Sequence, residues 1–172
     1  LGSLGVFILW LGWFGFNGGS QLAWGGDDSV AASAVVMVTN IAAAAGAIGA
    51  LFTSWLYLGK PSLSQTLNGA VAGLVAITAG CGNMTMAGGF FAGLIGGIIV
   101  VFSIEFIEKK LKIDDAIGAA SAHGVAGAWG TLVIGLWGVD GATGLGLFNG
   151  GGWNQLAIQA IGVAAYGAWA VV

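Results

Sequence analysis

Every charged side chain of this sequence falls in a gap between apolar runs or, like Glu105, at the end of one, which leaves His123 as the ionisable group deep inside a run. His123 stands seven residues past Ala116, where its run begins, or about 10 Å along a helix. Ionisable groups at such depth in a membrane are costly and usually face a bundle interior or a pathway. A neutral imidazole offers one donor and one acceptor, which suits a small polar solute or a proton relay. Alternatively, His123 bonds to a neighbouring helix and serves packing alone, and its neighbours Gly124 and Gly130 agree with either hypothesis.

The surroundings of His123 exclude several kinds of site. The chain has no second histidine, and a metal site needs three or four ligands, so we predict no metal site and no cofactor. Ser121 lies two positions away and does not share a helix face with His123, which excludes a Ser–His hydrolytic pair within this run. Cys81 is a lone cysteine, so no disulfide framework exists. We therefore predict that the protein is not an enzyme.

A second group with binding chemistry lies in the segment GWFGFNGGS. Trp13 and Phe16 are three residues apart and share a helix face, and Ser20 follows one turn later. Aromatic faces attract cations, and a serine hydroxyl accepts a hydrogen bond from one. The three residues therefore suit a small, incompletely hydrated cation, and Asp27 and Asp28 nearby would draw cations to this mouth. The alternative is an aromatic belt of the kind found at every membrane interface.

Composition identifies the elements that carry these residues. The chain has 172 residues, of which 58% are hydrophobic and 6% charged, with a mean hydropathy of +0.96. Soluble domains carry about 25% charged residues, and the apolar runs are longer than the roughly ten residues of a barrel strand. We predict an all-α, polytopic membrane helix bundle with about six transmembrane helices. These helices are expected at 1–24, 30–58, 62–82, 86–107, 116–139 and 155–172.

Local signals describe how the helices begin and pack. Asp28 or Ser29 can cap the second helix, and Asp114 or Asp115 can cap the fifth. The 34 glycines indicate close helix packing, because small residues let membrane helices approach one another. Three pairs have the G-x-x-x-G spacing: Gly69/Gly73, Gly89/Gly93 and Gly93/Gly97.

The basic residues predict the orientation. They are Lys60, Lys109, Lys110 and Lys112, and they occupy the second and fourth gaps between helices. Lysine is enriched in cytoplasmic loops, and alternate gaps lie on the same side of a membrane. We therefore predict a multi-pass protein of the cell or plasma membrane, with the Lys60 and Lys109–Lys112 loops in the cytoplasm. The gaps at 17–29, 80–86 and 140–154 then lie outside. The chain opens without Met inside one apolar run and closes inside another, so we expect a fragment of a longer protein.

Several motifs together resemble the ammonium transporter / methylammonium permease / Rhesus family. They are GWFGFNGGS, TNIAAAAGAI, GKPSL, NGAVAGLVAITAGCG, KLKIDDAIGAASAHGVAGAWGTL and NQLAIQAIGV, in the order and spacing of that family. The resemblance implies an eleven-helix, usually trimeric transporter built from two inverted five-helix repeats. This chain resembles the second repeat, helices six to ten, plus most of helix eleven.

The resemblance also implies roles for individual residues. Trp13, Phe16 and Ser20 match part of the outer ammonium recruitment site, and Phe16 also matches one of two gate phenylalanines. His123 matches the second of two histidines that line the pore. The implied partners are ammonium or ammonia, the lipid bilayer, two further copies in a homotrimer and a PII-type regulatory protein at the cytoplasmic face, with no nucleic acid. The sequence departs from some relatives at Gly80, where they have proline, and at Gly118, where they have aspartate.

Electrostatics agrees with that role. Moving an isolated cation into a low-dielectric interior costs roughly tens of kcal/mol, against a few for a neutral polar group. A narrow apolar pore therefore favours recruiting ammonium at the mouth, removing a proton and passing ammonia along imidazoles. The sequence leaves open electrogenic transport and a gas channel. The alternative functions are an ammonium sensor of the same family or another small-solute channel. Among the latter, an aquaporin-like channel with paired Asn-Pro-Ala motifs is excluded by the single proline, Pro61.

Overall fold

The computed structural model of the chain describes residues 1–140 and 144–171. Its described part is helical throughout and contains no strand, which confirms the all-α prediction with six helices. The α-helices are α1 (Gly2–Gly19), α2 (Asp27–Leu58), α3 (Leu63–Thr78), α4 (Met86–Phe106), α5 (Ala126–Trp137) and α6 (Asn154–Val171). Two π-helical segments, Ile107–Leu111 and Ala120–Val125, extend α4 and precede α5, and a 3-10 turn covers Leu147–Asn149.

The first two helices end or begin at other residues than expected, at positions next to a glycine. The expected first helix ran to residue 24, but α1 ends at Gly19, and the chain then turns through Leu22 at φ 62° and Gly25 at φ 112°. α2 begins three residues earlier than expected, at Asp27. The prediction that Asp28 or Ser29 caps this helix was wrong. Gly26 occupies the cap position, and both aspartates lie in the first turn, where the helix dipole favours negative charge.

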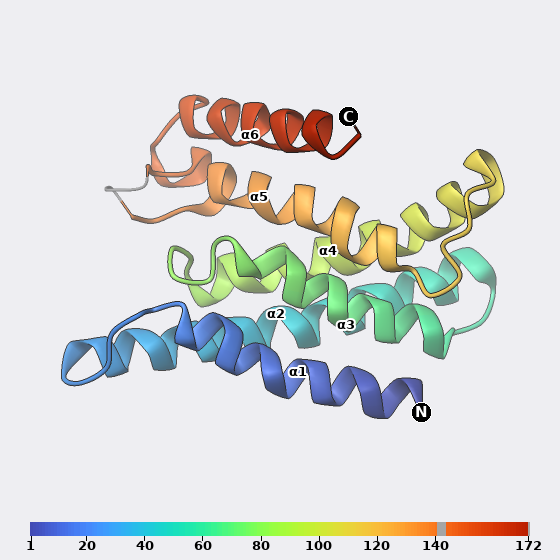
Figure 1. Ribbon diagram of the computed structural model, residues 1–172, viewed down its shortest axis with the longest axis horizontal. Helices are drawn as coiled ribbons and strands as arrows, with labels where there is room; N and C mark the ends of the chain where they lie inside the picture. The colour runs from blue at the N-terminus through green and yellow to red at the C-terminus, as the bar shows by residue number, and fades with distance from the viewer. Residues whose placement is uncertain (141–143, 172) are drawn as a thin grey trace.

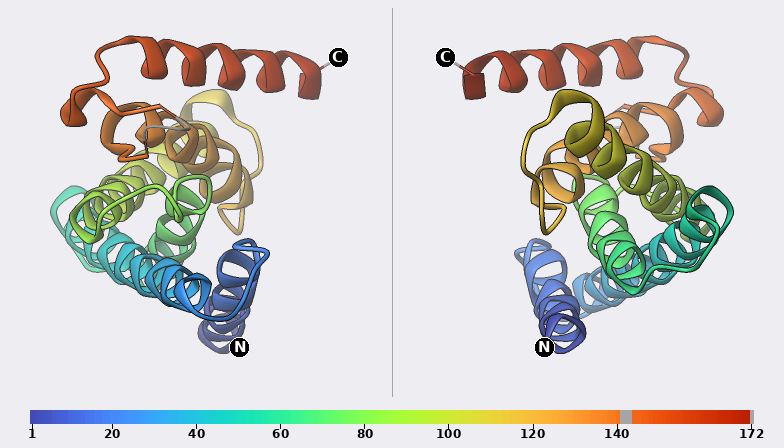
Figure 2. Two further views of the ribbon diagram at one scale, coloured as in Figure 1. Left: turned by 90° about the vertical axis from the view of Figure 1, so that its left-hand side faces the viewer. Right: turned by 90° about the vertical axis from the view of Figure 1, so that its right-hand side faces the viewer.

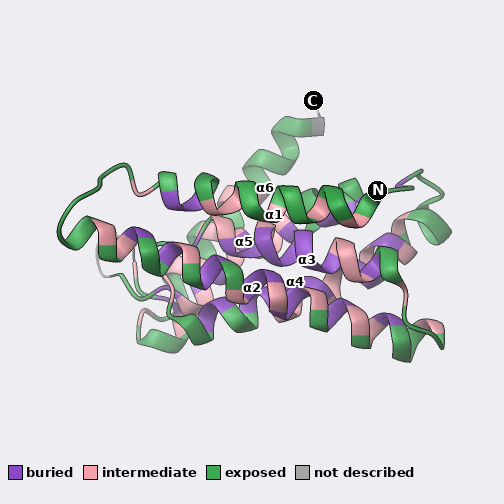
Figure 3. Cartoon of the chain, turned by 90° about the horizontal axis from the view of Figure 1, so that it is seen from below, coloured by how far each residue is buried: buried purple, intermediate pink, exposed green. Residues whose placement is uncertain are grey.

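Three helices form the centre of the bundle. α2, α3 and α4 pack on one another around small buried side chains, among them Ala50, Ala72 and Val100. α1 covers one side of α2 and α3, and α5 packs against α3 and α4 on another side. α6 contacts α5 at the edge of the molecule and runs obliquely to the other five helices (Figures 1 and 2). The buried residues accordingly concentrate in α2, α3 and α4, while α1 and α6 are largely exposed (Figure 3).

Glycines allow the three central helices to approach closely. A Cβ atom added at Gly93 would collide with the Ala42 carbonyl oxygen of α2, and one at Gly97 with the Gly46 carbonyl. From α3, Gly69 and Gly73 face the same stretch of α2. All three predicted G-x-x-x-G pairs therefore lie at contacts with α2, which confirms their role in close packing.

The loops alternate between the two ends of the bundle. The connections after α2 and α4 lie at the end where the N-terminus lies, and those after α1, α3 and α5 lie at the opposite end (Figure 1). All four lysines belong to the first set. This alternation is the arrangement on which the predicted orientation depends.

The helices differ in whether their length and hydropathy suffice to cross a bilayer. Within the described residues, Asp27–Leu58 and the continuous stretch Met86–Leu111 are long and apolar enough to cross a membrane, with 32 and 26 residues. α3 is also apolar but has 16 residues. The expected first, third and fifth spans were longer than α1, α3 and α5, because those apolar runs include loop residues such as Trp24 and Val139, whereas α2 is longer than expected.

Candidate functional site

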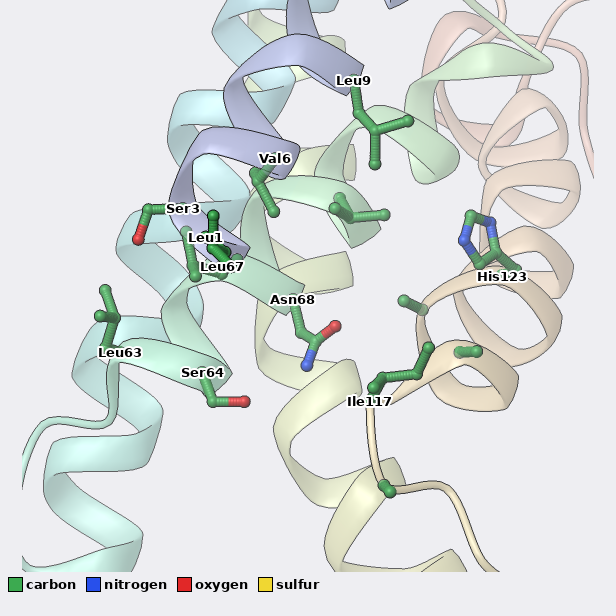
Figure 4. A pocket seen from close by; sticks show the side chains of 15 residues that line it. Leu1, Ser3, Val6, Leu9, Leu63, Ser64, Leu67, Asn68, Ile117 and His123 are labelled. Carbon is green, nitrogen blue, oxygen red and sulfur yellow. The ribbon is translucent and has the colours of Figure 1, made fainter.

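His123 lies on the π-helical turn Ala120–Val125, and its side chain is exposed. The imidazole faces a cavity of about 560 Å³ between α1, α3 and the segment that leads into α5. Figure 4 shows the ring directed into this space, with Leu9 and Val6 of α1 on the far side. The ring is therefore not enclosed by the helices of this chain.

The wall of this cavity is mainly apolar and carries few polar groups. Besides His123, the polar side chains are Ser3 of α1 and Ser64 and Asn68 of α3. Asn68 points into the cavity in Figure 4. Sequence reasoning missed Asn68, although an asparagine inside the apolar run NGAVAGLV was a signal of the same kind as His123.

The glycines beside His123 serve two different purposes. No atom lies within 4 Å of a Cβ added at Gly124, so this position contributes open space. A Cβ at Gly130 would lie 2.8 Å from the Ala76 carbonyl oxygen, so this glycine permits the close crossing of α5 and α3. A second cavity of about 320 Å³ lies against Gly124 and His123, where α5 faces Tyr166 of α6. Of the glycines beside His123, Gly124 therefore leaves open space and Gly130 permits a close helix crossing.

Trp13 and Phe16 lie together on the C-terminal half of α1. Their ring centroids are 6.1 Å apart at an interplanar angle of 63°, an edge-to-face arrangement. The indole Nε1 of Trp13 donates a hydrogen bond to Thr78 Oγ1 of α3 at 2.8 Å, which fixes that ring. Phe16 is 63% exposed. Both rings line a concavity of about 340 Å³, together with Ile8, Leu9 and Gly12.

Ser20 follows directly after α1 and is exposed. Its hydroxyl donates to the Phe16 carbonyl at 2.7 Å, which leaves the oxygen lone pairs directed outward to accept. The helix end beneath it is fixed by Asn17, which is 1% exposed and donates through Nδ2 to Thr39 Oγ1 of α2 at 3.0 Å. The structure thus brings Trp13, Phe16 and Ser20 to one end of α1.

The two groups of residues are neighbours along α1. Leu9 lines both the cavity of His123 and the concavity of Trp13 and Phe16. The concavity of Trp13 and Phe16 and the cavity of His123 therefore adjoin at Leu9. The arrangement offers aromatic faces and a hydroxyl acceptor at the C-terminal end of α1 and a hydrogen-bonding imidazole beside the adjoining cavity. Within the described residues, no three His, Cys, Asp or Glu side chains gather where they could hold a metal ion.

Comparisons with known proteins agree on one family. The model of the Ammonium Transporter Family matches residues 1–172. Ammonium transporter Amt2 of Archaeoglobus fulgidus is 41% identical over 176 residues, which cover 97% of this chain and 36% of that protein. The ammonium transporter of Bacillus subtilis is 40% identical over 159 residues, which cover 89% of this chain and 38% of that protein. The chain therefore spans well under half the length of these relatives.

Solved structures give the same result. A protein named Sensor Amt Protein superposes with a TM-score of 0.88 at 40% identity, covering 97% of this chain and 40% of its own. Mep2 of Candida albicans superposes with a TM-score of 0.86 at 32% identity, covering 97% of this chain and 37% of its own. The arrangement of helices described above is thus shared with parts of larger proteins.

Proposed function

Because this chain belongs to the ammonium transporter family of membrane proteins, we propose that it forms part of a path for ammonium or ammonia across a bilayer. Trp13, Phe16 and Ser20 recruit the ammonium cation at the outer mouth. The cation gives up a proton to water at that mouth, and neutral ammonia passes Phe16 and moves along the apolar wall beside His123. The relatives above are named as transporters, which favours transport over an enzymatic activity.

One observation carries this proposal: the His123 ring faces a largely apolar cavity that adjoins the aromatic concavity through Leu9. A cation would lose most of its hydration energy in such a space, whereas ammonia requires only one or two hydrogen bonds. The neutral imidazole supplies a donor and an acceptor for that purpose. The exposed phenyl ring of Phe16 narrows the entrance and disfavours hydrated ions.

The proposal extends to assembly and regulation. In the full-length protein, a first repeat with its own histidine closes the open side of the cavity, and three copies form a homotrimer in the bilayer. Exposed apolar side chains such as Phe7 and Phe52 supply the surfaces for lipid and for neighbouring helices. The exposed cytoplasmic loop that holds Lys110 and Lys112 contributes to a docking surface for a PII-type protein.

An ammonium sensor is the second candidate. The observation in its favour is the likeness to the Sensor Amt Protein at 40% identity. A sensor and a transporter can share the recruitment site, so the difference lies in whether substrate passes His123. Measured uptake therefore distinguishes the two functions, and simultaneous current recording distinguishes electrogenic transport from a gas channel.

The test is His123→Ala in the full-length protein, reconstituted in vesicles. Loss of the imidazole removes the hydrogen-bonding group from the apolar path, and we expect ammonium uptake to fall severalfold. The matched control is Val125→Ala, which lies on the same helical turn but lines neither cavity beside His123. Unchanged uptake in a normally folded His123→Ala protein would make His123 a packing residue and overturn the proposal.

A further inference from the structure

Three polar side chains form a chain of hydrogen bonds behind His123. Asp115 is 6% exposed, and its Oδ1 accepts the Ala120 N–H at 2.8 Å. Its Oδ2 accepts the Ser121 N–H at 3.1 Å and the Ser121 hydroxyl at 2.8 Å. Ser103 of α4 in turn donates to the Ser121 oxygen at 2.9 Å. The chain of bonds thus joins the loop, the π-helical turn and α4.

The carboxylate of Asp115 serves as the cap of the turn that carries His123. The first N–H groups of a helix lack partners within it, and the positive end of the helix dipole favours an anion there. Burial raises the pKa of Asp115, but the hydrogen bonds from Ala120, Ser121 and Ala119 outweigh burial and bring the pKa below its usual value. Asp115 therefore stays ionised at neutral pH. The residue at the N-cap position is nevertheless Ala119, not Asp114 or Asp115 as predicted, and Asp115 reaches the N–H groups of the turn from the preceding loop.

The helical form of the turn decides where the imidazole points. An α-helix holds about 3.6 residues per turn, whereas the i→i+5 bonds of a π-helix enclose a wider turn. A change of Ala120–Val125 from π to α form would rotate His123 about the helix axis, away from the cavity. Ser121 lies two residues before His123 and is 0% exposed, so its position fixes the start of that turn.

We infer that Asp115, Ser121 and Ser103 form a clamp that holds the π-helical turn and so directs the His123 ring into the cavity. This inference rests on the proposed function of His123. None of the three side chains lines either cavity beside the ring, as far as the described residues go. They are positioning residues that act through His123.

The test combines single and double variants of the full-length protein in vesicles. In Asp115→Asn, an amide group replaces one acceptor oxygen and cannot satisfy all the donors of Ala120 and Ser121. We expect the maximal ammonium uptake rate to fall severalfold, and no further than in His123→Ala, because misplacement of a ring by about 1 Å has large effects on rate. The half-saturating concentration should stay unchanged, since Trp13, Phe16 and Ser20 are untouched. The matched control is Asp114→Asn, which alters an exposed neighbour that accepts the Ala116 N–H at 3.2 Å.

Repeating Asp115→Asn in a His123→Ala protein shows whether Asp115 positions the His123 ring or only supports folding. If the clamp acts through the ring, Asp115→Asn causes no further loss in that background, because coupled sites are non-additive. An equal loss in both backgrounds would overturn the clamp while leaving the proposed function intact. Wild-type uptake by His123→Ala itself would overturn both. If Asp115→Asn does not accumulate, Ser121→Ala and Ser103→Ala replace it in the same cycle and decide the question.

Discussion

The hydroxyl of Ser20 illustrates how one side chain can serve both the fold and a ligand. Its proton is engaged by the Phe16 carbonyl, so the oxygen is left as an acceptor at the C-terminal end of α1. We expect Ser20→Leu to reduce ammonium uptake strongly at low ammonium and weakly at saturating ammonium. The reason is that loss of an acceptor weakens capture but does not alter the path past His123. Uptake rates over a range of ammonium concentrations check this expectation.

Ser33 offers a matched control for that experiment. It is exposed near the same end of the bundle, and its hydroxyl makes the same kind of bond, to the Ser29 carbonyl at 2.8 Å. Ser33→Leu therefore adds an equal apolar volume without touching the concavity and should leave uptake at both concentrations unchanged. A Ser20→Leu protein that loses the same fraction of uptake at low and at saturating ammonium would contradict a recruitment role.

The residues of the candidate site were predictable to different degrees. His123 was identified because an ionisable group inside an apolar run is rare, and Trp13 and Phe16 because their spacing places them on one face. The contact of Ser103 with Ser121 was not predictable, since it joins residues 18 positions apart and depends on how α4 packs beside the turn. The π-helical form of Ala120–Val125 leaves no simple periodic signal either.

At the scale of elements, the backbones of α2 and α4 can touch only because glycine carries a hydrogen atom where other residues carry a Cβ atom. A Cβ at Gly97 would collide with the Gly46 carbonyl, and neither backbone can yield without moving its helix. We expect Gly97→Ala to lower the free energy of unfolding by about 1–3 kcal/mol, the usual cost of overpacking. The midpoint of thermal unfolding in detergent measures the effect.

Gly5 of α1 is the control position, because no atom lies within 4 Å of a Cβ added there. Gly5→Ala should leave the free energy of unfolding unchanged or raise it by up to about 1 kcal/mol, because alanine favours a helix more than glycine does. Similar midpoints for Gly97→Ala and the unaltered protein would contradict the view that glycine sets the distance between α2 and α4.

The elements themselves followed from the apolar runs, but their ends did not. Hydropathy cannot separate a helix from an apolar loop, so residues 20–24 were assigned to the first helix although the chain turns there. The fifth helix was expected from residue 116, whereas its α-helical part begins at Ala126 after a capped loop and the π-helical turn. Asp115 was recognised as a possible cap, yet its partners five and six residues later lie beyond the usual capping distance.

At the scale of the whole molecule, the arrangement of loops carries the orientation. The loops after α2 and α4 lie at one end and hold every lysine, while Asp27 and Ser20 lie at the other (Figure 1). The end at which a loop lies depends only on how many helices precede it. The lysine positions therefore predicted the number of helices correctly. The assignment of an end to the cytoplasm rests on the additional rule that lysine is enriched there.

Cysteine labelling tests that assignment directly. In a full-length Cys81→Ala protein without other cysteines, we expect Lys60→Cys and Lys110→Cys to react with a membrane-impermeant maleimide only from the cytoplasmic side. Asp27→Cys should react only from outside, because an odd number of helices separates the exposed Asp27 from each lysine, one before Lys60 and three before Lys110. Reaction of all three positions from one side would contradict the helix arrangement. If the two lysine positions reacted only from outside and Asp27→Cys only from the cytoplasm, the helix arrangement would stand but its orientation would be reversed. Trp13, Phe16 and Ser20 would then face the cytoplasm.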